Sequence, residues 1–121
     1  MINVLKVLNT EMTRLLTNYA FDDWNTKKVL PYYVGEISEI ITGYEDGKSE
    51  YQFIITGTDK DTYTNLLNAL ELIKKEYKYG KKITLDNGVI VIIYDNSLTI
   101  PIENEDIKRI QINLSIRLWE N

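Results

Sequence analysis

The stretch from Pro31 to Tyr77 changes its hydrophobic period, and this change limits the fold more than any other feature of the sequence. Side chains alternate between two faces across Tyr32–Ile40 and again across Tyr51–Thr58, which is the pattern of β-strands. Apolar residues then recur at three- and four-residue steps from Tyr63 to Tyr77, as in an amphipathic helix. The stretch therefore predicts two strands, antiparallel to each other, followed by a helix.

A second amphipathic helix is predicted at the N-terminus, over residues 2–19. Its apolar stripe consists of Val4, Leu5, Leu8, Met12, Leu15, Leu16 and Tyr19. Residues 20–31 are interpreted as a connector, because Asp22–Asn25 has the composition of a turn and Pro31 disfavours helix at the residue before it.

The segment between the second helix and the last strand contains several turn signals. Thr58–Thr62 offers helix-capping side chains, and Gly80 is expected to lie just beyond the helix end. An Asn87-Gly88 pair separates Lys82–Leu85 from Val89–Tyr94, which predicts a hairpin with positive φ at both central residues. We also expect a turn at Asp95–Ser97 and a short edge strand at Leu98–Ile102.

The last strand, Arg109–Trp119, alternates most regularly. One face carries Ile110, Ile112, Leu114, Ile116 and Leu118, and the other carries Arg109, Gln111, Asn113, Ser115, Arg117 and Trp119. The predicted order is α-β-β-α-β-β-(β)-β. It indicates one α+β domain over residues 1–121, a two-layer fold in which a mostly antiparallel sheet of roughly four to six strands carries both helices on one face.

The other face of that sheet has two interpretations. Antiparallel sheets commonly expose one face to water, so a solvated face is the simpler one. The second is a contact between subunits, because tryptophan and arginine are enriched at protein interfaces.

The composition removes most routes to catalysis. The chain has no histidine and no cysteine, so imidazole acid–base groups, thiolate nucleophiles, disulfides and cysteine–zinc sites are excluded. Glu36 and Glu39 have an odd spacing that places them on opposite strand faces, and Asp59 and Asp61 flank a helix start, where carboxylates commonly cap. We expect no catalytic residue, metal or cofactor and no enzymatic activity; a carboxylate-based hydrolase is the competing enzyme hypothesis.

Charge and hydropathy also limit the partners. The net charge is −4, which argues against specific nucleic-acid binding, since that needs a basic footprint. No segment approaches the roughly 20 apolar residues that span a bilayer. We read the lysines at positions 74, 75, 78, 81 and 82 first as a solvated patch that complements the helix dipole, and second as a contact for a phosphate or an acidic partner. A location inside a cell is expected.

Three motifs lie between Pro31 and Gly57: Pro31-Tyr32-Tyr33-Val34-Gly35-Glu36, Glu45-Asp46-Gly47 and Phe53-Ile54-Ile55-Thr56-Gly57. An N-terminal helix precedes them, and a helix ending near Ile73-Lys74-Lys75 follows. In this layout the chain resembles the tail terminator, tail completion or minor head–tail joining proteins of phages and prophages of Gram-positive bacteria. It departs from the family pattern at Asp59-Lys60-Asp61, where a more basic or glycine-containing entry to the helix is typical.

The resemblance implies a structural protein that forms a ring, commonly a hexamer, on the end of the polymerised tail tube and joins the tail to the head connector. Its partners would be further copies of itself, the tail tube protein and the connector protein. It would act in the bacterial host cytoplasm during assembly and then in the virion or a tail-like particle. DNA would pass through the lumen of the ring, where acidic loops would repel it.

The candidate contact patches are the polar face of the last strand and the loop Thr42–Ser49. The candidate oligomer or tube interface consists of Tyr33, Glu36, Glu45, Asp46, Arg109, Gln111, Asn113, Arg117 and Trp119. The alternative, from another functional class, is a non-enzymatic monomeric adaptor or regulatory domain that binds one peptide or protein.

Overall fold

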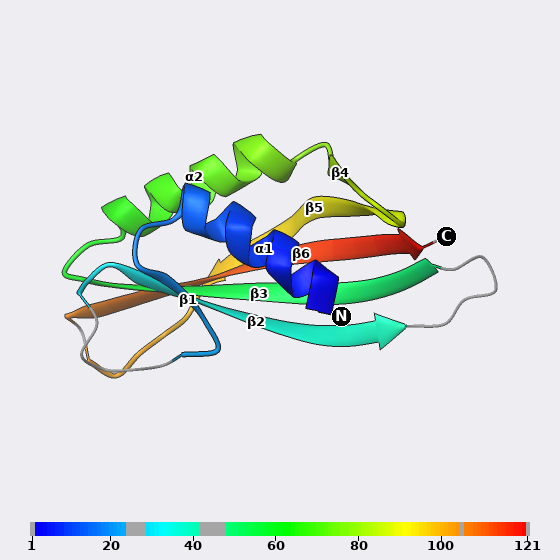
Figure 1. Ribbon diagram of the computed structural model, residues 1–121. Helices are drawn as coiled ribbons and strands as arrows, with labels where there is room; N and C mark the ends of the chain where they lie inside the picture. Colours follow the sequence, from blue (N-terminus) through cyan, green and yellow to red (C-terminus); the bar gives the residue numbers. More distant parts are fainter. Residues whose placement is uncertain (1, 24–28, 42–47, 105, 121) are drawn as a thin grey trace.

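A computed structural model describes residues 2–23, 29–41, 48–104 and 106–120. Within these residues, two helices and the six strands of one sheet occur in the order α-β-β-β-α-β-β-β, so the predicted α+β class is confirmed (Figure 1). The elements are α1 (Ile2–Leu15), β1 (Tyr19–Phe21), β2 (Tyr32–Ile41), β3 (Lys48–Lys60), α2 (Thr64–Tyr77), β4 (Lys81–Leu85), β5 (Gly88–Thr99) and β6 (Ile107–Glu120).

The strands form one mixed sheet in the order β1-β2-β3-β6-β5-β4. The three-residue strand β1 runs parallel to β2, and every other neighbouring pair is antiparallel. Both helices lie on the same face of this sheet (Figure 1). The C-terminal strand β6 lies inside the sheet, between β3 and β5. Because the helices cover one face of the sheet, apolar and polar side chains alternate regularly along this strand.

The core lies between the helices and the sheet. The apolar stripe of each helix meets the apolar side of the central strands, as expected when a two-layer fold has one covered face. The fully buried side chains from the helices include Val4, Leu8, Met12, Leu66, Ile73 and Tyr77, and those from the strands include Phe53, Ile55, Ile90, Ile92, Ile112, Leu114 and Ile116.

The N-terminal helix ends earlier than the sequence predicted. It stops at Leu15, and Asn18 takes a positive φ of 51°, a conformation that asparagine tolerates better than most residues. The Asn18 carbonyl oxygen accepts a hydrogen bond from the Tyr33 N–H at 3.2 Å, so the chain turns into a strand beside β2. Tyr19 therefore belongs to β1, and the prediction of a connector from residue 20 onward missed this strand.

Two predicted turns also differ. Asp95–Ser97 is not a turn: β5 continues to Thr99 through a register shift between Tyr94 and Asn96, so the predicted separate strand at residues 98–102 begins as the end of β5. In the β4–β5 hairpin the two loop residues are Asp86 and Asn87, and neither these nor Gly88 has a positive φ. Gly88 is needed for another reason, because a Cβ there would lie 2.2 Å from the Trp119 carbonyl oxygen.

The ends of α2 agree only in part with the capping residues predicted from the sequence. Strand β3 runs on through Lys60, so much of the predicted capping run is strand. Thr62 Oγ1 accepts a hydrogen bond from the Thr64 N–H at 3.4 Å, and Asp59 Oδ2 accepts one from Asn65 Nδ2 at 3.0 Å. Gly80, with a φ of 85°, lies just beyond the helix end, as predicted.

Candidate functional site

The sheet face opposite α1 and α2 is the candidate site, and we call it the open face because no helix of the described residues covers it. On β6 it carries the predicted polar set, while the alternate residues from Ile110 to Leu118 are buried against the helices. Part of this face is covered: Val34, Thr56 and Thr58 are buried, and the connection from β5 to β6 passes beneath the sheet at that end (Figure 1). The other end, towards Trp119, is more accessible.

Polar side chains on the open face bond to one another along and across β6. Arg109 Nε donates to Thr58 Oγ1 at 3.0 Å, and Gln111 Nε2 donates to Asn113 Oδ1 at 3.0 Å. Asn113 Nδ2 in turn donates to Asn96 Oδ1 at 2.6 Å, and Ser115 Oγ donates to an Asp95 carboxylate oxygen. These bonds hold the side chains in fixed positions, which lowers the entropy lost when a partner binds.

The accessible end of the open face is charged and aromatic. Glu50 Oε1 lies 3.1 Å from Lys48 Nζ and 3.9 Å from Arg117 Nε. The Lys48 ammonium also lies 5.8 Å from the centre of the Trp119 ring, within cation–π range. We call these four residues, Lys48, Glu50, Arg117 and Trp119, the charged end.

The structure brings together only part of the predicted interface set. Arg109, Gln111, Arg117 and Trp119 share the open face, and Glu36 lies on β2 opposite Ile54, further along the same face. Asn113 is on this face too, but it is buried and cannot contact a partner as it stands. Tyr33 does not belong with them: it points into the core, is 2% exposed, and burial raises the pKa of its hydroxyl to about 12. Glu45 and Asp46, like the rest of residues 42–47 in the predicted contact loop, lie outside the described residues.

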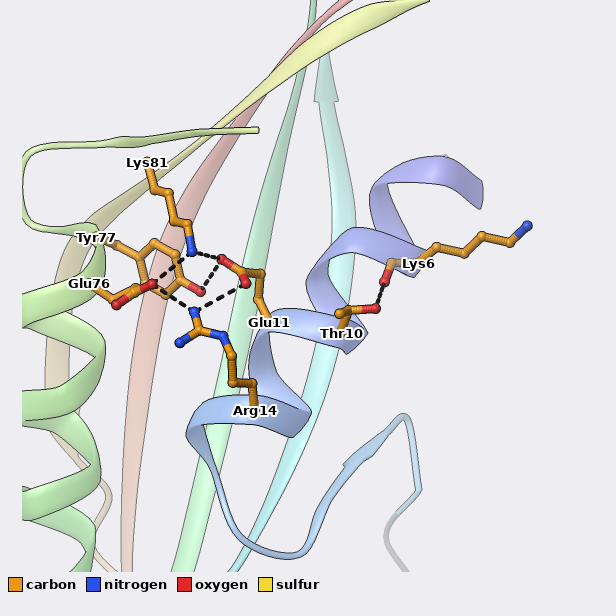
Figure 2. A network of polar contacts seen from close by, with 7 residues as sticks. All are labelled: Lys6, Thr10, Glu11, Arg14, Glu76, Tyr77 and Lys81. Atoms are coloured by element: carbon orange, nitrogen blue, oxygen red, sulfur yellow. Dashed lines mark hydrogen bonds and ion pairs between the residues drawn. The ribbon is translucent and has the colours of Figure 1, made fainter. Parts of the chain in front are cut away.

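A buried polar network was missed by sequence reasoning. Glu11 of α1 is 8% exposed, and its carboxylate accepts hydrogen bonds from Tyr77 at 3.1 Å, Lys81 at 2.7 Å and Arg14 at 3.2 Å (Figure 2). Glu76 Oε1 accepts from the same Arg14 and Lys81 at 2.7 and 2.8 Å. The network joins α1, α2 and β4. The one sequence signal was a glutamate directly beside Met12 of the apolar stripe.

This network makes the stability depend on pH. Burial would raise the pKa of Glu11, but hydrogen bonds from Lys81, Arg14 and Tyr77 together outweigh burial and lower it below its ordinary value of 4.5. A lowered pKa in the folded state stabilises the fold above the unfolded-state value, and this contribution is lost as the pH falls through the folded-state value.

We therefore expect the unfolding temperature to fall as the pH decreases below about 4.5, and to fall less steeply in Glu11→Gln, which cannot titrate at this position. Thermal unfolding followed by circular dichroism between about pH 6 and pH 3 measures both curves. Parallel curves for the two proteins would contradict the assignment of this acid sensitivity to Glu11.

The C-terminal half of α2 borders an open hollow of about 590 Å³. It is lined by Glu71, Lys74, Lys75, Lys78, Tyr79 and Tyr94. Lys74 Nζ lies 5.7 Å from the Tyr94 ring centre and 3.8 Å from a Glu71 carboxylate oxygen, so its charge already has partners within the chain.

Comparison with protein-family models matches no family, and comparison with curated protein sequences finds no match. Within the described residues no cluster of acidic side chains is suited to hold a metal ion. Neither helix among these residues is long and apolar enough to cross a membrane.

Proposed function

We propose that this chain is a structural protein that caps the end of a polymerised phage or phage-like tail tube as a ring and joins the tail to the head connector. The observation that carries the proposal is the charged end of the open face, where Arg117 and Trp119 lie on a sheet surface that no helix covers. Arginine and tryptophan are enriched among the residues that contribute most to binding at protein interfaces.

The resemblance to tail terminators supports the same proposal. The Pro31–Glu36 motif forms the first half of β2, and the Phe53–Gly57 motif forms the middle of β3, so the two lie side by side in the sheet. The Phe53–Gly57 motif in turn pairs with Ile110–Leu114 of β6, the strand that carries most of the predicted polar set. Capping a tube requires a surface that matches a repeating partner, and it does not require a reactive side chain.

Substitution at the charged end tests whether this surface contacts a partner. We expect the double variant Arg117→Glu with Trp119→Ala to lose binding to the tube end at least tenfold, because arginine and tryptophan are enriched among the few interface residues whose truncation costs about 2 kcal/mol or more. Its own unfolding free energy should change by less than about 1.5 kcal/mol, since Arg117 is exposed and Trp119 half-buried.

A matched control is Lys75→Glu on the exposed surface of α2. Co-sedimentation with polymerised tube protein measures the binding of wild type, double variant and control. Equal binding by the double variant and the wild type would show that the charged end of the open face does not contact the tube.

The function itself is tested by light scattering and electron microscopy, with and without the tube protein of the same particle. We expect a closed ring on the tube end, and shorter tubes when the chain is present during polymerisation. A protein that stays monomeric and leaves tube length unchanged would overturn the proposal and favour the monomeric adaptor.

A further inference from the structure

Two sheet edges lack a strand partner among the described residues. Strand β4 is the outermost strand on one side, so its outer edge is open. On the other side β1 covers only Tyr33–Gly35 of β2, which leaves the outer edge of Glu36–Ile41 without a paired strand in the described part of the chain. Unpaired edges carry free N–H and C=O groups, which readily pair with a strand of another chain.

The two open edges match in direction. Four antiparallel steps separate β2 from β4, so the two strands run the same way. One lateral row of paired residues crosses the sheet through Glu39, Tyr51, Ile116, Ile92 and Lys81. A second copy placed beside the first therefore brings β4 next to β2 in parallel. Lys81 then lies level with Glu39, so a displacement of two residues along the strands sets the whole of β4 beside Ile37–Ile41. Because two is an even number, the helices of both copies stay on the same side of the joined sheet.

The charges on the two edges are complementary. Strand β4 carries Lys81 and Lys82 and no acidic residue, whereas the free part of β2 carries Glu36 and Glu39 and no basic residue. Lys81 already bonds to Glu11 and Glu76 within the chain, so the exposed Lys82 is the main positive charge of this edge. Pairing β4 with β4, or β2 with β2, would bring together two edges of like charge with no opposite charge between them. Pairing β4 with β2 places opposite charges together. The edges thus favour a contact between two different patches, the kind that rotation repeats into a ring.

We propose that copies of this chain join edge to edge, with β4 of one copy pairing in parallel with Glu36–Ile41 of β2 of the next. This inference rests on the proposed function, because it supplies the contact that closes the ring. The sheet then continues from subunit to subunit with all helices on one side and all open faces on the other. The charged ends gather on a single surface, which presents one repeated pattern to the tube.

The absence of natural cysteine makes cross-linking a direct test. The variants are Ile40→Cys on β2 and Thr84→Cys on β4, which are both exposed and leave all four edge charges in place. A short bismaleimide is added to the double variant and to each single variant, both bound to tube protein and free. A pair with one cysteine moved away from both edges, Thr84→Cys with Thr13→Cys on α1, is the matched control.

We expect the double variant on tubes to give a ladder of covalent oligomers, and the single variants and the control pair to give none. Should Ile40→Cys unfold below the wild-type temperature, Ser38→Cys takes its place with the same expected ladder. Cross-linking by Thr84→Cys alone would show β4 paired with β4 and overturn the inference.

The remaining outcomes separate this inference from the proposed function. Rings visible on tube ends without a ladder would overturn the edge pairing and leave the capping function standing. Failure to assemble on tubes under any condition would overturn both. A second variant, Glu39→Lys, is expected to weaken ring assembly at least tenfold while unfolding at the wild-type temperature, and unchanged assembly would count against the edge contact.

Discussion

Replacing Phe53 by alanine is expected to lower the free energy of unfolding by about 3–5 kcal/mol, the usual loss for a buried phenylalanine. Phe53 is fully buried at the middle of β3, between Ile37 of β2 and Leu114 of β6. Its ring also fills the space above Gly35, where an added Cβ would lie 2.5 Å from it. Alanine would leave a cavity that the surrounding strands cannot close. Urea unfolding followed by circular dichroism measures the loss.

The next residue along β3 provides the matched control for this prediction. Ile54 lies on the open face and is only half-buried, so Ile54→Ala should cost less than about 1.5 kcal/mol. Equal losses at the two positions would contradict a fold with one covered face and one open face.

Glu11→Ala is expected to lower the free energy of unfolding by about 2–4 kcal/mol at neutral pH. The substitution leaves the buried Tyr77 hydroxyl without its acceptor and removes the carboxylate that faces Lys81 and Arg14. Removing one partner of a buried ion pair costs more than the pair contributes, because the remaining groups stay desolvated. Glu76 still accepts from both cations, and Lys81 is partly exposed, which keeps the loss below that of a fully buried pair.

Glu71→Ala is the control for Glu11→Ala, because Glu71 also forms an ion pair, with Lys74 at 3.8 Å, but its side chain is 72% exposed. We expect a change of less than about 0.5 kcal/mol there, as for most exposed pairs. Comparable losses for Glu11→Ala and Glu71→Ala would show that the network does not hold α1, α2 and β4 together.

The parts of the fold predicted from sequence are those in which one period dominates. The alternation in β6 and the apolar stripes of both helices follow directly from burial on a single side. Strand β1 could not be predicted, because three residues carry no period and their strand geometry depends on pairing with β2. At Asp95–Ser97 the residue types favour a turn, but pairing with β6 keeps the segment extended. The irregularity appears only as a shift of the strand register between Tyr94 and Asn96.

In the candidate site, too, only the residues that follow a regular alternation could be predicted from the sequence. The open-face residues of β6 follow from alternation alone, whereas Tyr33 was placed with them through a motif, although strand parity puts it opposite Gly57 on the helix side. The Glu11 network joins residues far apart in the sequence, so no local pattern could reveal it. The edge contact depends on sheet order, which places β2 and β4 on opposite sides and cannot be read from the order along the chain.

In the proposed function, copies of this chain close the end of a tail tube by fitting against one another and against the tube. Electron microscopy of particles made by a mutant that lacks this chain tests this proposal through the length of the tails and their attachment to heads. We expect tubes of irregular, extended length that are not joined to filled heads, and rescue by the wild-type chain. Tails of normal length joined to filled heads in the mutant would contradict the claim.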